Sequence, residues 1–127
     1  MSGNPVVHFE IIGRDTAGLR RYFGALFGWE FELGDADPVS APGEYGFVHP
    51  TESPDGPAGI PGGIGGGAGH APQVLFYVGV SDVEAALAEA ERLGGTRVSG
   101  PAGTPGTLVV GRFADPEGHV VGVAGPA

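Results

Sequence analysis

The chain has 127 residues, no cysteine, and six basic against 15 acidic residues, which gives a formal net charge of −9. This length supports one domain, and the lack of cysteine excludes disulfides, thiolate metal sites and thiol nucleophiles. The negative charge disfavours nucleic acid and anionic membrane as partners, no apolar run approaches membrane-spanning length, and the start lacks a signal-peptide pattern, which predicts a cytoplasmic protein.

The first predicted element is a strand over residues 6–13, where apolar and polar residues alternate with a period of two. His8 and Glu10 lie on one face of this strand. The other face, expected to pack on a helix, carries Val7, Phe9 and Ile11. Asp15 then predicts a helix N-cap and Gly28 a C-terminal cap. The apolar residues at helical spacing between these caps are Leu19, Tyr22, Phe23, Leu26 and Phe27.

The same strand–helix pattern returns over residues 73–95. Asp82 predicts the second N-cap, and Gly94 and Gly95 close the second helix. At a shift of 67 residues the core and cap positions match in pairs, which indicates an internal duplication. The matched pairs are Val7 and Val74, Phe9 and Phe76, Ile11 and Val78, Asp15 and Asp82, Leu26 and Leu93, and Gly28 and Gly95.

Short strand-like segments follow each predicted helix, so each half is predicted to have the order β-α-β-β-β. The segments are residues 30–33, 45–49 and 59–67 in the first half, and 96–99, 107–113 and 119–123 in the second. The expected fold is α+β, with modules over about 5–67 and 73–125 in a single domain, 1–127. Two such modules bury their second faces by curving around an approximate twofold and a shared cavity. Part of the glycine-rich connector is expected to form an edge strand.

Alternation along the strands predicts which residues line this cavity. Leu75 and Tyr77 join His8 and Glu10, and Gly122 faces the cavity from the last strand. Arg112 is a candidate partner for the Glu10 carboxylate, since a buried carboxylate requires pairing or solvation. The predicted ligand-binding residues are His8, Glu10, Phe47, Leu75, Tyr77, Arg112 and Gly122, and the candidates for acid–base catalysis are His8, Glu10 and Tyr77.

The segment GIGGGA at residues 63–68 imitates a dinucleotide-binding fingerprint. However, Gly69, His70 and Pro72 follow it in place of a helix, so the helix N-terminus that would hold a phosphate is not predicted. No nucleotide cofactor is therefore expected.

Four segments together resemble the vicinal oxygen chelate superfamily, which includes glyoxalase I, bleomycin-resistance proteins and extradiol dioxygenases. They are VVHFEI, YFGALFGW, DVEAALAEAERLGG and FADPEGHVVGV. The resemblance covers nearly the whole chain and is weakest over residues 34–72. It implies the two-module α+β fold, whereas function is left open because the superfamily supports many chemistries.

The resemblance also implies four positions at which metal-dependent members place ligands, on the first and last strands of each half. They correspond here to His8, Leu75, Gly122 and an unassigned residue within GIPGGIGG. Leucine and glycine side chains cannot bind a metal, and catalytic sites use at least three protein ligands, so no metal centre is expected. The alternative is an iron site that uses His8, Glu10 and a further histidine from His49, His70 or His119.

The resemblance and the acidic charge favour a metal-free protein that binds a small molecule, cationic or aromatic in character, and sequesters an antibiotic or secondary metabolite as a homodimer. The alternative is a cofactor-free lyase, isomerase or cyclase with His8 as base, Glu10 as its partner and Tyr77 as an opposing donor. A third interpretation is a degenerate family member that serves as an accessory protein. A metal-dependent glyoxalase or dioxygenase is the least favoured.

Overall fold

The computed structural model describes residues 3–34, 40, 43–49 and 59–127. The chain forms two compact units, and these are described separately. The first unit is His8–Val74, and the second is Leu75–Ala127 together with Met1–Val7. Along the chain the element order β-α-β-β-β occurs twice. The predicted α+β fold of two modules is therefore confirmed, while their joining into a single domain stays a prediction.

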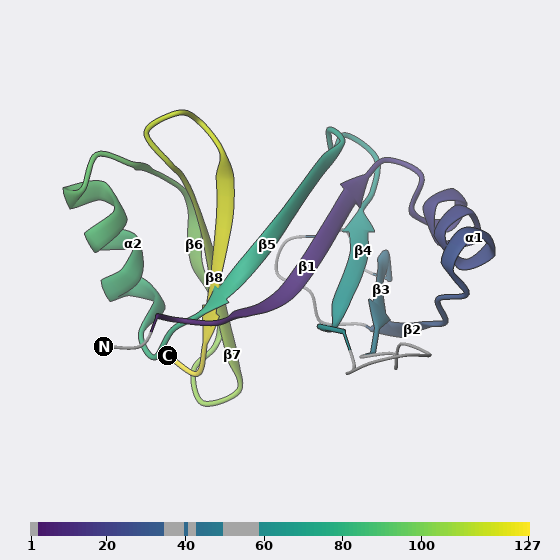
Figure 1. Ribbon diagram of the computed structural model, residues 1–127, viewed down its shortest axis with the longest axis horizontal. Helices are drawn as coiled ribbons and strands as arrows, with labels where there is room; N and C mark the ends of the chain where they lie inside the picture. The colour runs from purple at the N-terminus through teal and green to yellow at the C-terminus, as the bar shows by residue number, and fades with distance from the viewer. Residues whose placement is uncertain (1–2, 35–39, 41–42, 50–58) are drawn as a thin grey trace. The chain divides into compact units, whose positions relative to one another are not determined.

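The first unit contains one helix and a four-stranded sheet (Figure 1). Its elements are β1 (Val6–Gly13), α1 (Thr16–Phe27), β2 (Phe31–Gly34), β3 (Tyr45–Val48) and β4 (Gly62–Gly66). The strand order is β2-β3-β4-β1, with β1 and β4 parallel and the other pairs antiparallel. The glycine-rich strand β4 thus lies between β3 and β1. The expected edge strand is wrong for these residues, because four of the five residues of β4 are glycines, which allow rings from both neighbouring strands to lie over it.

Helix α1 has both predicted caps and one aromatic face. The Asp15 carboxylate accepts a hydrogen bond from the Gly18 N–H at 2.9 Å, and Gly28 ends the helix in the left-handed region with φ 72°. The Trp29 ring then packs against Phe9 of β1, with 5.3 Å between ring centroids. Two further rings that contact Trp29 come from α1, namely Phe23 and Phe27. This aromatic cluster joins the helix end to the α1 face of the sheet.

The second unit repeats the arrangement around α2, which Figure 1 shows beside β6, β7 and β8. Its elements are β5 (Gln73–Gly79), α2 (Val83–Arg92), β6 (Thr96–Thr104), β7 (Leu108–Ala114) and β8 (Val120–Gly125). The strand order is β5-β8-β7-β6, with β5 and β8 parallel and the remaining pairs antiparallel. Asp82 caps α2 as predicted, since its carboxylate accepts a hydrogen bond from the Ala85 N–H at 3.0 Å.

The core of the second unit lies between α2 and strands β7 and β8. Val83 and Leu87 of α2 are fully buried and pack on Val109 and Val123. Gly111 of β7 gives Leu87 its space, because a Cβ atom at Gly111 would lie 2.7 Å from Leu87 Cδ1. The helix side of this sheet is therefore fitted to the Leu87 side chain.

Two of the four residues predicted to form the apolar face of residues 73–80 do not pack on a helix. Val80 joins the α2 core and Val78 lies beside it, whereas Val74 is 74% exposed and Phe76 43% exposed. The physical reason is what α2 covers: its ten residues pack on β6, β7 and β8 rather than on the first half of β5. The expectation that Val74 and Phe76 face a helix is therefore wrong.

The motif DPEGH forms a tight turn that leads into β8. The Asp115 carboxylate accepts hydrogen bonds from the backbone N–H groups of His119 and Glu117, both at 2.9 Å, and Gly118 takes φ 98°. The hydrogen bond from the His119 N–H is the largest effect that lowers the pKa of Asp115 below its ordinary value of 3.8. The side chain of His119 also contacts this carboxylate, at 2.9 Å from Nδ1 to Oδ2.

The turn is expected to loosen in acid. Because the pKa of Asp115 is lowered on folding, its contribution is complete above the unfolded value of about 4 and is lost as the pH falls through the folded value. Amide chemical shifts of Glu117 and His119, followed below pH 5, should show a midpoint under 4. Asp115→Asn should remove this step. A midpoint at or above the unfolded value would contradict the assigned hydrogen bonds.

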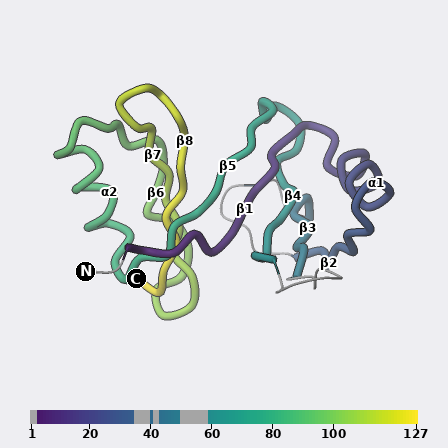
Figure 2. The backbone as a smooth tube through the Cα atoms, viewed as in Figure 1, coloured from purple at the N-terminus to yellow at the C-terminus, as the bar shows by residue number. Residues whose placement is uncertain are grey.

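The C-terminus closes against the start of α2, where the Val83 N–H donates to the Ala127 carbonyl at 2.7 Å. Figure 2 shows the chain end beside this helix start. Within the described residues, the helices are too short and too polar to cross a membrane.

Candidate functional site

In the first unit, the candidate site is built around His8 on β1. His8 Nε2 lies 2.8 Å from the hydroxyl oxygen of Tyr45 on β3, and the two rings are near parallel at 17° with centroids 6.4 Å apart. Phe47 meets the same tyrosine edge-on, with 4.8 Å between centroids. The predicted residues His8 and Phe47 are thus brought together through Tyr45, which the sequence did not single out.

Glu10 lies on the same face of β1 as His8, since the two are separated by one residue. Its side chain is 3% exposed. Glu10 and Thr16 are the two polar side chains that are buried among the described residues. A carboxylate removed from water in this way requires hydrogen bonds or a charge partner. The Glu10 carboxylate is therefore stabilised by protein groups rather than by water.

Strand β4 supplies the surface on which Tyr45 lies. A Cβ atom added at Gly63 would lie 2.2 Å from the Tyr45 hydroxyl oxygen, and one at Gly65 would lie 2.5 Å from Tyr45 Cδ2. On the opposite face, a Cβ atom at Gly62 would fall within 2.1 Å of the Phe9 ring. Gly62, Gly63 and Gly65 are therefore seats for aromatic rings, and strand β5 rather than a helix follows β4.

In the second unit, the predicted residues Tyr77, Arg112 and Gly122 meet on one face of the sheet. Gly122 of β8 is in register with Tyr77 of β5 on one side and Arg112 of β7 on the other. The Arg112 Nε–H donates to the Tyr77 hydroxyl oxygen at 3.1 Å. Tyr77 is 3% exposed and Leu75, on the same strand face, is 4% exposed.

The space above Gly122 is filled by the ring of Tyr77. A Cβ atom at Gly122 would lie 2.3 Å from Tyr77 Cδ2 and 2.4 Å from Cε2. That this glycine faces away from α2 agrees with the predicted strand alternation. The ring-filled space, however, gives Gly122 a structural role in holding Tyr77, and its part in ligand binding stays a prediction.

The strand register shows which residue of GIPGGIGG corresponds to the fourth metal-ligand position implied by the resemblance. Glu10 pairs with Gly63 in the parallel β1–β4 ladder, as Tyr77 pairs with Gly122 in the parallel β5–β8 ladder. Glu10 and Tyr77 also correspond at the 67-residue shift, so Gly63 is the counterpart of Gly122. Both positions carry a glycine beneath a tyrosine ring.

These residues do not fit the metal that the superfamily resemblance implies. Of the four corresponding positions, one is a histidine, one a buried leucine, and two are glycines that seat aromatic rings. His49 and His119 bond instead to Glu32 and Asp115. In the part of the chain that the structure describes, no three His, Asp or Glu side chains gather closely enough to hold a metal ion. The alternative iron site with His8 and Glu10 therefore lacks a third ligand among these residues.

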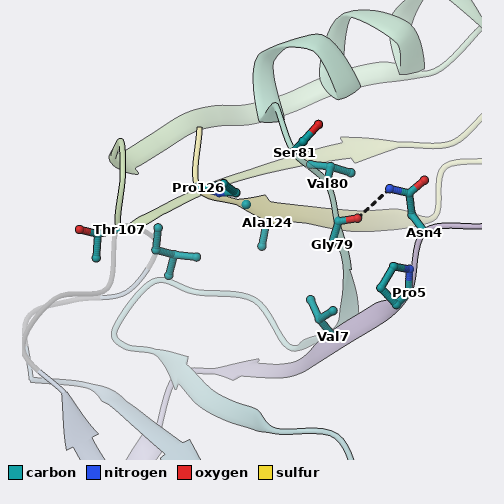
Figure 3. Close-up of a pocket in the computed structure, with 11 residues that line it drawn as sticks. Asn4, Pro5, Val7, Gly79, Val80, Ser81, Thr107, Ala124 and Pro126 are labelled. Atoms are coloured by element: carbon teal, nitrogen blue, oxygen red, sulfur yellow. Dashed lines mark hydrogen bonds between the residues drawn. The ribbon is translucent and has the colours of Figure 1, made fainter.

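A separate pocket of about 550 Å³ lies in the second unit, at the ends of β5 and β8. Figure 3 shows Asn4, whose side-chain amide donates to the Gly79 carbonyl at 2.9 Å, on one side of it. Most of the lining is aliphatic, with hydroxyls from Ser81 and Thr107. A second hollow, of about 370 Å³, lies between α2 and the sheet and includes Leu93 and Phe113. None of the predicted site residues lines either space.

Comparisons with solved structures identify the fold. A methylmalonyl-CoA epimerase in complex with methylmalonyl-CoA and NH4+ is 16% identical, with a TM-score of 0.65 over 99% of this chain and 96% of that one. A hypothetical protein from Bacillus halodurans is 10% identical, with a TM-score of 0.66 over 98% and 95%. The methylmalonyl-CoA epimerase from Mycobacterium tuberculosis is 17% identical, with a TM-score of 0.57 over 100% and 93%. No curated protein matches the chain.

The paired β-α-β-β-β modules and these neighbours show the fold that the resemblance to the vicinal oxygen chelate superfamily implied. The model of a glyoxalase-like domain matches residues 9–124. The chain therefore belongs to the glyoxalase-like domain family.

Proposed function

We propose that this protein binds a small organic molecule without a metal ion, and that His8 and Glu10 of the first unit, and Tyr77 and Arg112 of the second, are recognition groups. One observation carries the proposal. At two positions where metal-dependent members place ligands, this chain has glycines, Gly63 and Gly122, and tyrosine rings fill the space above them. Polar side chains remain, so the chain has kept recognition groups where it lacks metal ligands.

The chemical character of the ligand follows from the same residues. Phe47 is partly exposed and offers aromatic surface, Glu10 carries a buried carboxylate, and the net charge is −9. Aromatic faces and a carboxylate favour a cationic or aromatic guest. We therefore propose an antibiotic or another secondary metabolite of this class, which the protein sequesters. The proposal includes a homodimer, and its mass in solution can be measured by light scattering.

The binding proposal is tested by a thermal-shift screen of cationic aromatic antibiotics, with zinc and nickel ions in parallel. A true ligand raises the melting temperature in a concentration-dependent way. We expect at least one antibiotic to stabilise the protein equally with and without a chelator. His8→Ala should weaken its binding by about tenfold, the loss of one hydrogen-bonding contact of roughly 1.4 kcal/mol.

The matched control is His49→Ala, because the His49 side chain is 70% exposed and bonds to Glu32 at the surface. It should leave ligand affinity unchanged. Stabilisation by zinc or nickel that the chelator reverses, and that His8→Ala abolishes, would contradict a metal-free site.

The second candidate function is cofactor-free proton transfer by a lyase, isomerase or cyclase. The hydrogen bond between His8 Nε2 and Tyr45 supports it in the tautomer in which Nε2–H donates to the hydroxyl oxygen, because unprotonated Nδ1 can then accept a proton. Glu10 and Tyr77 would be the further proton-handling groups. Incubating the protein with methylmalonyl-CoA, the ligand of one structural neighbour, in D2O tests this chemistry. Deuterium uptake that His8→Ala abolishes would support catalysis, and an unchanged compound would favour binding.

A further inference from the structure

Tyr45 is a buried side chain that contacts His8, and no sequence motif pointed to it. Its exposure is 3%, and its hydroxyl oxygen lies 2.8 Å from His8 Nε2. The Phe47 ring packs against its edge. Contacts with His8 at the hydroxyl and with Phe47 at the ring edge hold the Tyr45 side chain in one position. The geometry of its hydrogen bond to His8 is therefore fixed as well.

The glycines of β4 hold this tyrosine by leaving space rather than by adopting unusual backbone angles. Gly63 and Gly65 do not have the positive φ that Gly66 takes at the strand end. A Cβ atom at Gly63 would nevertheless overlap Tyr45, at 2.2 Å from the hydroxyl oxygen and 2.3 Å from Cε1. Any side chain at Gly63 would therefore push the hydroxyl away from His8.

The second unit contains the same device, made from different strands. Tyr77 comes from β5 rather than β3, it lies over Gly122, and its hydroxyl oxygen accepts a hydrogen bond from Arg112. Each unit thus contains a tyrosine that lies over the corresponding glycine. The hydroxyl group of this tyrosine makes a hydrogen bond with a side-chain nitrogen. Because this arrangement occurs in both units, we infer that its role is to hold the tyrosine hydroxyl in one position.

We propose that Tyr45 is a positioning residue, which fixes the ring orientation and tautomer of His8. A phenol is a stronger hydrogen-bond donor than acceptor, because its oxygen lone pairs are drawn into the ring. Tyr45 therefore donates its O–H to Nε2, and the neutral imidazole carries its proton on Nδ1. In this tautomer Nδ1–H is the donor group of His8. The inference rests on the proposed role of His8 in binding, and it adds Tyr45 and Gly63 to the site.

Long-range ¹H–¹⁵N spectra of the labelled full chain at about pH 8, where imidazole is neutral, test this proposal without any ligand. His8→Ala assigns the His8 signals among those of the four histidines. The wild-type protein should show an unprotonated Nε2 and a protonated Nδ1. Tyr45→Phe keeps the ring and removes the hydroxyl, and it should abolish this pattern in favour of the opposite or an averaged tautomer.

Gly63→Ala should have the same effect as Tyr45→Phe, because it displaces the hydroxyl. Gly59→Ala is the matched control, since an added Cβ atom there meets no heavy atom within 4 Å, and its spectrum should match the wild type. A protonated Nε2 in the wild type, or a His8 pattern unchanged by Tyr45→Phe, would overturn the proposal. This result is independent of the antibiotic screen, so failure of one leaves the other standing.

Discussion

Leu87→Ala is expected to lower the free energy of unfolding by about 2–5 kcal/mol, the range for removing a buried leucine side chain. Leu87 is fully buried, and it packs on Val83, Val109 and Val123. The closeness of its Cδ1 to Gly111 leaves the site little means to collapse after truncation, because Gly111 has no side chain to move. Helix α2 has ten residues, too few to be stable alone, so it depends on this contact.

Urea unfolding followed by circular dichroism measures the effect, with the midpoint and slope compared between variants. Leu93→Ala is the matched control, since Leu93 follows the same helix and is 65% exposed. It should change the free energy of unfolding by less than about 0.5 kcal/mol. Equal losses from the two variants would show that α2 is not held through Leu87.

Gly122→Ala is expected to cost about 1–3 kcal/mol, the usual range for adding a methyl group to a packed interior. The new Cβ atom would lie 2.3 Å from the Tyr77 ring, so the ring must move. Tyr77 is 3% exposed and its hydroxyl accepts a hydrogen bond from Arg112, so the shift disturbs packing and that bond together. Urea unfolding gives the stability change, and tyrosine fluorescence or NMR reports the ring.

The partner variant for this prediction is Gly122→Ala combined with Tyr77→Ala. Removing the ring removes the overlap, so the double variant should lose less than the sum of the two single variants. Gly59→Ala serves as the glycine control and should be close to neutral. Additive losses in the double variant would mean that the alanine at position 122 disturbs something other than Tyr77.

The element order and the helix caps could be predicted from the sequence because they depend on local patterns. Period-two alternation gave β1 and β5, and Asp15 and Asp82 cap their helices through bonds that span three residues. The duplication also helped the prediction, because the strand–helix pattern over residues 73–95 is clearer than the one over residues 6–28. The turn made by Asp115 was likewise encoded within five residues of sequence.

The candidate site was predicted less completely because its contacts join distant parts of the chain. Tyr45 and His8 are 37 residues apart, and the segment between them includes the region of weakest pattern. A glycine in a strand reveals that space is needed but not which ring fills it. Gly122 was therefore identified correctly as a special position, while the occupant of its space, Tyr77, required the β5–β8 register.

Val74 and Phe76 illustrate a different limit. Their alternation is as regular as that of Val7 and Phe9, and alternation predicts a face without stating what covers it. In the first unit Trp29 covers Phe9. At the 67-residue shift the corresponding residue of the second unit is Thr96, which has no ring to offer. The apolar face of the strand thus occurs in both units, but the aromatic residue that covers it occurs only in the first.

The tyrosine seated on Gly122 also restricts the order in which mutations can arise. A carboxylate at position 122 collides with the ring as long as Tyr77 is present, and loss of the ring alone leaves a hole in a packed sheet. Either first step lowers stability, so a lineage with this pair can gain a metal ligand at position 122 only through a destabilised intermediate. The same barrier exists at Gly63 beneath Tyr45, and a four-ligand site would have to cross both.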